Sequence, residues 1–345
     1  MNIVLRRMSI IAIRMGLAIF MLAGCGPRTR NPNYDAEAQP SLQTQLLAPS
    51  SNSQRQPAID GTHVVWSEKI ADYWQIILFD MSDQKRVQLT EDEMNHVTPS
   101  ISGDRVVWQQ GPPGGEDSLA GVNWVSRQSI QLPVSRASPA RINGTKITWN
   151  GEVDVGTWRS PIIWFDVVRQ LSKEVVRSEA ASWPSLDGDF VVWEDERNGN
   201  SDIFGYDTIS GREFPVVVAP RDQEHPSISG NIVVWQDNRN GVALNDNDIY
   251  GYDIGNNRVF VISVRGGNEY DPRISDQIVA WTDAVGGNSN VYGYDLSTRK
   301  LFTVAADQFG NSQVDLSGST IVWVRADKPN DRNAHTQIAY ARYHS

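Results

Sequence analysis

The chain has 345 residues, of which 40% are hydrophobic and 9% aromatic, and this composition excludes a disordered protein. Three of its basic residues, Arg6, Arg7 and Arg14, lie in an N-terminal leader. From residue 25 onward, 28 Lys and Arg stand against 41 Asp and Glu, a net charge of −13. A surface of this sign repels phosphate groups, so we expect no nucleic-acid partner.

The leader, residues 1–24, begins with basic residues and continues with an apolar run over 15–23. Spanning a bilayer takes about 20 apolar residues, so the shorter run predicts a secretory signal peptide. The leader is followed by Cys25 in the word "LAGC", which resembles the lipobox of bacterial lipoproteins. The resemblance implies that Cys25 is lipidated and becomes the first mature residue; a plain cleaved signal peptide is the alternative.

Residues 25–41 are polar, contain proline and show no periodicity, which predicts a flexible tether. The expected product is an extracytoplasmic bacterial protein, in the periplasm or at the cell surface, held on the cell membrane or outer membrane by its lipid. Cys25 is the only cysteine, so the folded part cannot contain an internal disulfide.

The remaining residues, 42–345, repeat with a period near 42. Seven short apolar segments end in tryptophan, and successive tryptophans are 42, 41, 44, 42, 46 and 42 residues apart. These tryptophans are Trp66, Trp108, Trp149, Trp193, Trp235, Trp281 and Trp323. A period of this length with four short strands predicts an all-β protein, a seven-bladed β-propeller of four-stranded antiparallel blades.

Each period has the same internal order. A proline is expected at the first position of the first strand, and a dipeptide such as Asp-Gly or Ser-Gly supplies the positive φ of the following turn. The third strand most often ends in Asp, and Trp124 is expected at that position in the second blade. The last period has only three strands, so a strand near residues 44–48 is expected to complete the seventh blade and close the ring.

Blades four and five contain the words "PSLDGDFVVWEDERNG" and "PSISGNIVVWQDNRNG", followed by "DIFGYD" and "DIYGYD". These words resemble the TolB-like propeller repeats of bacterial secreted and surface proteins. The resemblance implies a propeller but no particular activity. TolB itself carries an α/β domain before six blades, so its partners are not transferred to this chain.

The long loops between strands two and three, and between blades, are expected on one face, which we predict to be the binding face. The position just before each first strand lies near the central channel and differs between blades: Gln56, Thr98, Ser138, Trp183, His225, Asp271 and Gln313. His225 and Asp271 could form an acid/base pair, or a divalent-metal site together with His96. A loop histidine bonded to its neighbour is the alternative, and no cofactor is expected.

Several aromatic residues in or beside the long loops could stack on a sugar or a peptide: Tyr73, Trp74, Trp158, Trp183 and Tyr270. Packing over the blade seams is the alternative. No nucleophile motif is present. We therefore expect a monomeric protein-binding or glycan-binding scaffold; a polysaccharide lyase or glycosidase with a pore-centred site and a purely structural envelope protein are the alternatives.

The acidic stretch "WEDERNGNSDIFGYD" at 193–207 has the composition of a cation-binding loop. Its spacing does not fit an EF-hand, because Gly205 stands where the bidentate Glu is required. The repeat instead predicts that Arg197 and Asn198 brace the loop, that Asp202 ties its backbone and that Asp207 accepts backbone hydrogen bonds in the next turn.

Overall fold

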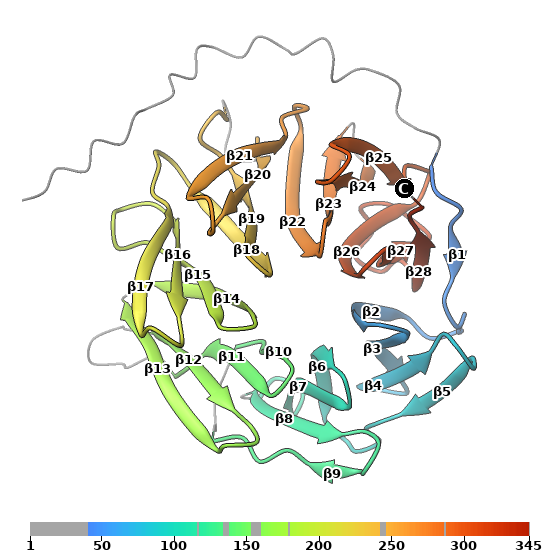
Figure 1. Cartoon of the computed structure of the whole chain (residues 1–345). Coiled ribbons are helices and arrows are strands. Elements are labelled where there is room, and N and C mark those ends of the chain that lie inside the picture. Colours follow the sequence, from blue (N-terminus) through green and yellow to red (C-terminus); the bar gives the residue numbers. More distant parts are fainter. Residues whose placement is uncertain are drawn as a thin grey trace, which may run out of the picture.

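The computed structural model describes residues 41–115, 117–133, 138–152, 160–178, 180–241, 246–285 and 288–344. These residues form seven four-stranded antiparallel sheets around a central axis, so the predicted seven-bladed β-propeller is confirmed (Figure 1). The leader, Cys25 and most of the expected tether lie outside the described residues. The described part of the chain contains no helix long and apolar enough to cross a membrane.

In each blade the four strands lie side by side, from an innermost strand next to the axis to an outer strand at the rim. The innermost strands are β2 (Gln54–Asp60), β6 (Asn95–Ser102), β10 (Arg141–Asn143), β14 (Ala181–Asp187), β18 (Gln223–Ser229), β22 (Asn268–Ser275) and β26 (Gly310–Ser317). The second strands are β3 (His63–Ile70), β7 (Arg105–Gly111), β11 (Lys146–Asn150), β15 (Phe190–Asp195), β19 (Ile232–Asp237), β23 (Ile278–Val285) and β27 (Thr320–Ala326).

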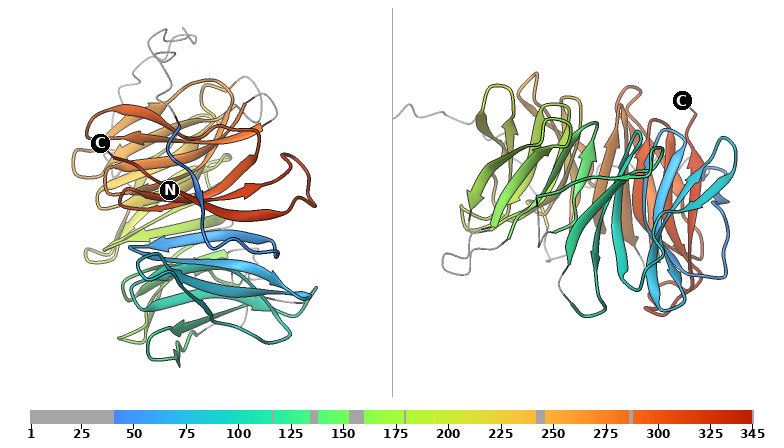
Figure 2. Two further views of the ribbon diagram at one scale, coloured as in Figure 1. Left: turned by 90° about the vertical axis from the view of Figure 1, so that its right-hand side faces the viewer. Right: turned by 90° about the horizontal axis from the view of Figure 1, so that it is seen from below.

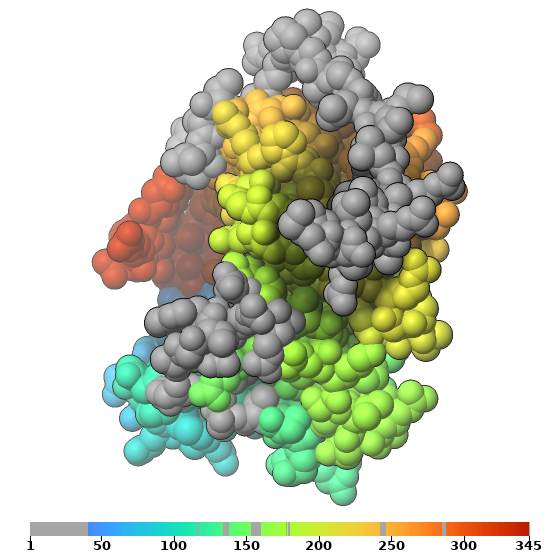
Figure 3. Space-filling model, turned by 90° about the vertical axis from the view of Figure 1, so that its left-hand side faces the viewer, coloured from blue at the N-terminus to red at the C-terminus, as the bar shows by residue number. Residues whose placement is uncertain are grey.

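The third strands are β4 (Tyr73–Asp80), β8 (Ser118–Asn123), β12 (Ser160–Asp166), β16 (Asp202–Asp207), β20 (Asp248–Asp253), β24 (Asn288–Asp295) and β28 (Thr336–Arg342). The outer strands are β5 (Lys85–Gln88), β9 (Gln128–Ser129), β13 (Leu171–Ser178), β17 (Arg212–Val217), β21 (Arg258–Ser263), β25 (Lys300–Ala305) and β1 (Gln45–Leu46). In the space-filling view the blades follow one another along the rim from cyan to yellow (Figure 3).

The two ends of the chain meet in the seventh blade. Strand β1 pairs with β28, with Gln45 opposite Tyr340 and Leu46 opposite Ala339, which confirms the predicted closing strand (Figures 1 and 2). The next residue, Leu47, is buried and its backbone N–H donates to the Ile338 carbonyl over 2.7 Å. Strands from the two ends of the described chain are therefore held in one sheet, which joins the first blade to the last and closes the ring.

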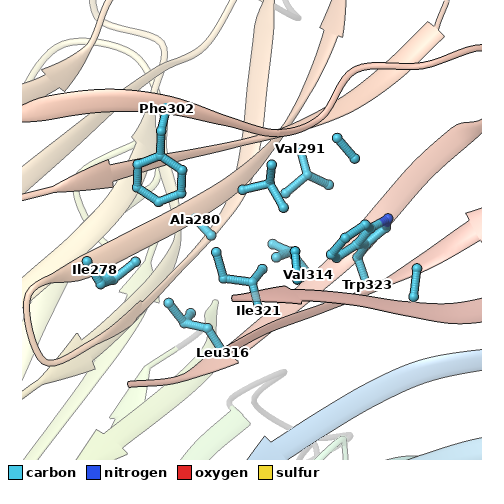
Figure 4. Packing of buried hydrophobic residues seen from close by; sticks show 12 residues of the cluster. Ile278, Ala280, Val291, Phe302, Val314, Leu316, Ile321 and Trp323 are labelled. Atoms are coloured by element: carbon cyan, nitrogen blue, oxygen red, sulfur yellow. The ribbon is translucent and has the colours of Figure 1, made fainter. Parts of the chain in front are cut away.

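The hydrophobic core is divided into seven clusters, each lying between two consecutive blades. Figure 4 shows the cluster between blades six and seven, built from Ile278, Ala280, Val291, Phe302, Val314, Leu316, Ile321 and Trp323. The repeating tryptophans are buried at these seams. In six blades the indole N–H donates to a side chain of its own blade: Glu68, Gln110, Asp195, Asp237, Glu269 and Asn311.

The acidic stretch in blade four braces its own loop, as predicted. Arg197 Nη2 lies 2.5 Å from Asp195 Oδ2, and Asn198 Nδ2 donates to Asp202 Oδ2 over 2.7 Å. Asp207 Oδ1 accepts the backbone N–H groups of the next turn. The same Arg-to-Asp contact recurs in blade five. These carboxylates are therefore held by groups of the blade itself.

Two expectations about strand positions were wrong. Five of the six prolines expected at strand starts lie within the innermost strands, as Pro57 does in β2, where a β-bulge shifts the register between Arg55 and Ala58. Pro139 precedes β10. A bulge leaves a residue outside the ladder, so a proline without an N–H fits there. Asn123, and not Trp124, ends the third strand of blade two, and its Oδ1 accepts the turn N–H groups.

Candidate functional site

One end of the central channel is occupied by hydrogen bonds that join the blades. The side chain before each tight turn accepts the backbone N–H of the next blade's turn, at distances from 2.6 to 3.4 Å. These acceptors are Asp60, Ser102, Asn143, Asp187, Ser229, Ser275 and Ser317. The polar groups at this end therefore join each blade to the next.

The predicted channel position has an unusual backbone. Six of its seven residues have φ between 50° and 55°: Gln56, Thr98, Trp183, His225, Asp271 and Gln313. They lie inside the innermost strands at the bulges and not before these strands, which corrects the expected placement. A positive φ is uncommon for residues with a β-carbon, and such strain persists where the surroundings impose it.

Neighbouring blades impose this conformation. The His225 N–H donates to Glu194 Oε1 over 2.5 Å, and the Asp271 N–H donates to Gln236 Oε1 over 3.1 Å. Each acceptor follows the repeating tryptophan of the preceding blade. The backbone of the channel rim is thus fixed from one blade to the next, and the rim side chains are held in place.

Three predicted residues meet at the long-loop mouth of the channel. His225 Nδ1 lies 2.5 Å from Asp271 Oδ1, a contact that fits both the acid/base pair and the alternative of a loop histidine bonded to its neighbour. The Trp183 ring lies against the imidazole, with centroids 4.4 Å apart, and 51% of Trp183 remains exposed. The arrangement places an accessible aromatic face beside an ionisable pair.

Burial acts to lower the pKa of His225, but the Asp271 and Glu194 carboxylates outweigh it and the pKa lies above its usual value. Burial likewise acts to raise the pKa of Asp271, and His225 together with the channel arginines holds it below its usual value. Each member of the pair therefore favours the charged form of the other. Glu194 is 5% exposed, and its burial raises its pKa to about 7.

The middle of the channel carries three charges that sequence reasoning missed. A cavity of about 340 Å³ runs along the innermost strands. Its middle ring consists of Ala58, Ser100, Arg141, Ser185, Ser227, Arg273 and Asp315. The burial of Arg141, together with the nearby Arg273 charge, lowers its pKa to about 10, whereas burial raises the pKa of Asp315. Arg141 still carries its charge at neutral pH.

The other predicted site residues lie elsewhere. His96 is buried, its Nε2 lies 2.7 Å from Asp92 Oδ1, and its ring packs against Trp108. The described residues contain no group of three or more His, Cys, Asp or Glu side chains that could hold a metal ion. The structure therefore does not bring His96 to His225 and Asp271.

The predicted aromatic residues outside the mouth have other surroundings. The Trp74 ring lies under the Arg55 guanidinium, 3.7 Å from its Cζ. Tyr270 is half-buried in β22, where it pairs with Thr282 of β23. Trp158 lies outside the described residues. Among the described candidates, Trp183 is the aromatic residue that lines the channel.

No protein-family model matches the chain, and no curated protein matches it in sequence. Among solved structures, the propeller domain of the Trilobed protease from Pyrococcus furiosus is similar with 14% identity and a TM-score of 0.65, covering 84% of this chain and 93% of that domain. An oligogalacturonate lyase in complex with manganese has 13% identity and a TM-score of 0.65, covering 90% and 95%. TolB from Acinetobacter baumannii has 16% identity and a TM-score of 0.51, covering 81% and 79%. These similarities show a shared β-propeller fold.

Proposed function

We propose that the protein is a lipid-anchored extracytoplasmic binding module that captures the end of a glycan or protein ligand at the long-loop mouth of its channel. The observation that carries this proposal is the half-exposed Trp183 ring against the His225–Asp271 pair. An accessible aromatic face beside a few fixed polar groups is the usual composition of a ligand site.

The backbone supports the same proposal. Trp183, His225 and Asp271 all have positive φ and lie on three successive blades. Gln56, Thr98 and Gln313 share this φ, so it belongs to the repeat; at the mouth it fixes the direction in which the three side chains leave the backbone. Preorganised side chains lower the entropy cost of binding. The mouth therefore has the rigidity of a binding surface.

Trp183→Ala is expected to weaken ligand binding by about 2 kcal/mol, or roughly 30-fold, because aromatic anchors dominate binding energies. Ligands would be sought on an array of neutral and acidic oligosaccharides, and among proteins cross-linked to the chain in whole cells. Trp74→Ala is the matched control, since that ring is covered by Arg55. Equal binding by Trp183→Ala and the parent protein would refute the proposed site.

The same experiment separates the alternatives. Release of products from a bound oligosaccharide, seen by mass spectrometry and lost in His225→Asn, would favour a lyase or glycosidase; Glu194, with a pKa of about 7, is then the second acid/base group. Failure to find any ligand or cross-linked partner would favour a structural envelope role.

The anchor is part of this proposal and rests on the leader and Cys25. Cys25→Ala is expected to move the protein from the membrane fraction to the soluble fraction, because a protein surface with a net charge of −13 has no attraction of its own to anionic lipid. Fractionation followed by immunoblotting measures the shift. A variant that stays in the membrane fraction would contradict lipid anchoring at this residue.

A further inference from the structure

We infer that Arg141 and Arg273 form a carboxylate-binding site in the middle of the channel, beneath the mouth, and that it takes the acidic sugar at the end of a glycan. The inference rests on the proposed function and specifies its ligand. Both residues line the same cavity, and each comes from a ring position that holds Ala or Ser in four other blades. The two guanidinium groups come from blades three and six.

The Arg141 guanidinium feels the charges of Asp315 and Asp271 without bonding to either carboxylate. Among the described residues, its guanidinium has no hydrogen bond and no carboxylate within 4.0 Å. A buried charge whose hydrogen-bond donors are unused is destabilising, and a ligand that accepts from those donors offsets this cost. Arg141 also lines the cavity, so a ligand can reach it.

The neighbouring groups leave donors free for a ligand. Arg273 donates from Nη1 to the Pro272 carbonyl over 3.0 Å, and this is the hydrogen bond that its guanidinium makes among the described residues. Asp315, the single acid of the ring, accepts the Ile59 N–H over 3.0 Å. The Asp271 carboxylate also acts on both arginines, so two guanidinium groups share two carboxyl groups, and what the arginines offer a ligand is their free hydrogen-bond donors. A planar fork of N–H donors matches a carboxylate through two parallel hydrogen bonds.

The two ends of the channel specify the direction of entry and the rest of the ligand. At the turn end, Asp60 and Asp187 are bonded between blades, and their charges repel an approaching anion. At the long-loop end, the exposed Trp183 ring offers a flat apolar surface of the kind that stacks on a sugar. A uronate entering from the mouth would place its carboxylate at the arginines and its neighbouring sugar at Trp183.

The test titrates the purified full chain with a disaccharide that ends in glucuronate and with its glucose-terminated counterpart, using calorimetry. We expect saturable binding of the acidic sugar and at least about tenfold weaker binding of the neutral one. Arg141→Gln and Arg273→Gln should each weaken glucuronate binding about tenfold or more, since hydrogen bonds to charged groups are lost. Arg212→Gln, which changes an exposed arginine on outer strand β17, should bind like the parent protein.

The outcomes distinguish this inference from the proposed function. Equal affinity for both sugars, or unchanged glucuronate binding by the two channel variants, overturns the carboxylate site. If Trp183→Ala still loses binding in that case, the mouth remains the binding surface. Tight binding of a peptide with a free C-terminus, abolished by amidation, in place of the sugar overturns the assignment to a glycan. No Trp183-dependent binding of any kind overturns the proposed function itself.

Thermal unfolding supplies a readout independent of the ligand. Arg141→Gln should unfold no earlier than the parent protein, because the described structure gives the guanidinium no bond to lose. Glucuronate should raise the midpoint of the parent protein and leave that of Arg141→Gln unchanged. A large loss of stability in Arg141→Gln would assign the residue a structural role and overturn the inference.

Discussion

Trp193→Ala is expected to lower the free energy of unfolding by about 3–5 kcal/mol, the range seen when a large buried ring is truncated. Trp193 is fully buried between blades three and four, where its ring packs among Ile162, Trp164 and Leu186. The truncation also removes the indole donor from Asp195 Oδ2. Native proteins are stable by only about 5–15 kcal/mol, so the change consumes a large part of the total.

Urea unfolding followed by circular dichroism measures the effect. Trp183→Ala is the matched control, since the same chemical change at a half-exposed mouth residue should alter stability by less than about 0.5 kcal/mol. The pair separates the packing of tryptophan between blades from the ligand contact that we propose for Trp183. Similar losses in both variants would contradict that division.

The architecture could be predicted from the sequence because a propeller repeats its own signals. Seven tryptophans at a near-constant period fixed the number of blades, and the incomplete last period placed the closing strand at β1. The errors were local. In a sequence, a proline before an apolar segment indicates the first residue of a strand. Only the strand pairing in the structure shows that Pro57 lies in a bulge after Arg55.

The site could be predicted only in part. Trp183, His225 and Asp271 were found because they differ from their counterparts in other blades at one repeat position. Arg273 and Asp315 show the same kind of difference two residues later, and Arg141 shows it three residues later, because blade three has one extra residue there. In the sequence this position belongs to the apolar segment of the first strand, so we did not expect its side chain to face the channel. Comparing every repeat position across the seven blades, and not only the position at the bulge, would have found it.

Glu194 was missed for another reason. It lies in the acidic stretch whose other members brace a loop, and only the contact with the next blade shows its position at the channel rim. Glu194 contacts His225 of the next blade, 31 residues further along the chain, and a local motif does not extend over that distance. Contacts between repeats therefore remain hidden from sequence reasoning, even where the repeat itself is plain.

The stability of the protein is expected to fall as the pH rises from about 5 to 8, and Glu269→Gln should reduce this fall. Glu269 is fully buried in blade six, and burial raises its pKa to about 8. In the unfolded chain the group ionises near its usual pKa of 4.5. Between these two pKa values the folded state binds a proton that the unfolded state has released. The free energy of unfolding therefore falls as the pH rises through this range.

Glu68 provides the matched control because it accepts the tryptophan N–H of blade one, as Glu269 does in blade six. Burial acts to raise the pKa of Glu68, but hydrogen bonds from Trp66, Gln54 and Ser50 and the charge of Arg86, 3.1 Å away, lower it. The sign is opposite: the ionised carboxylate of Glu68 stabilises the fold above pH 4.5, and this stabilisation is lost as the pH falls through the lowered pKa.

Urea midpoints of the parent protein and both variants from pH 4 to 9 measure the contrast. Each unit of pKa difference corresponds to about 1.4 kcal/mol. The free energy of unfolding of Glu269→Gln should therefore exceed that of the parent protein by up to a few kcal/mol at pH 9 and equal it near pH 5. A residual slope should remain, because burial also raises the pKa of Asp283 to about 6 and that of Glu194 to about 7. Glu68→Gln should be less stable than the parent protein at pH 7 by about 1.5–3 kcal/mol. If both variants lost stability at pH 9, Glu269 would be ionised and bonded in the folded state, and the two blades would use the carboxyl group in the same way.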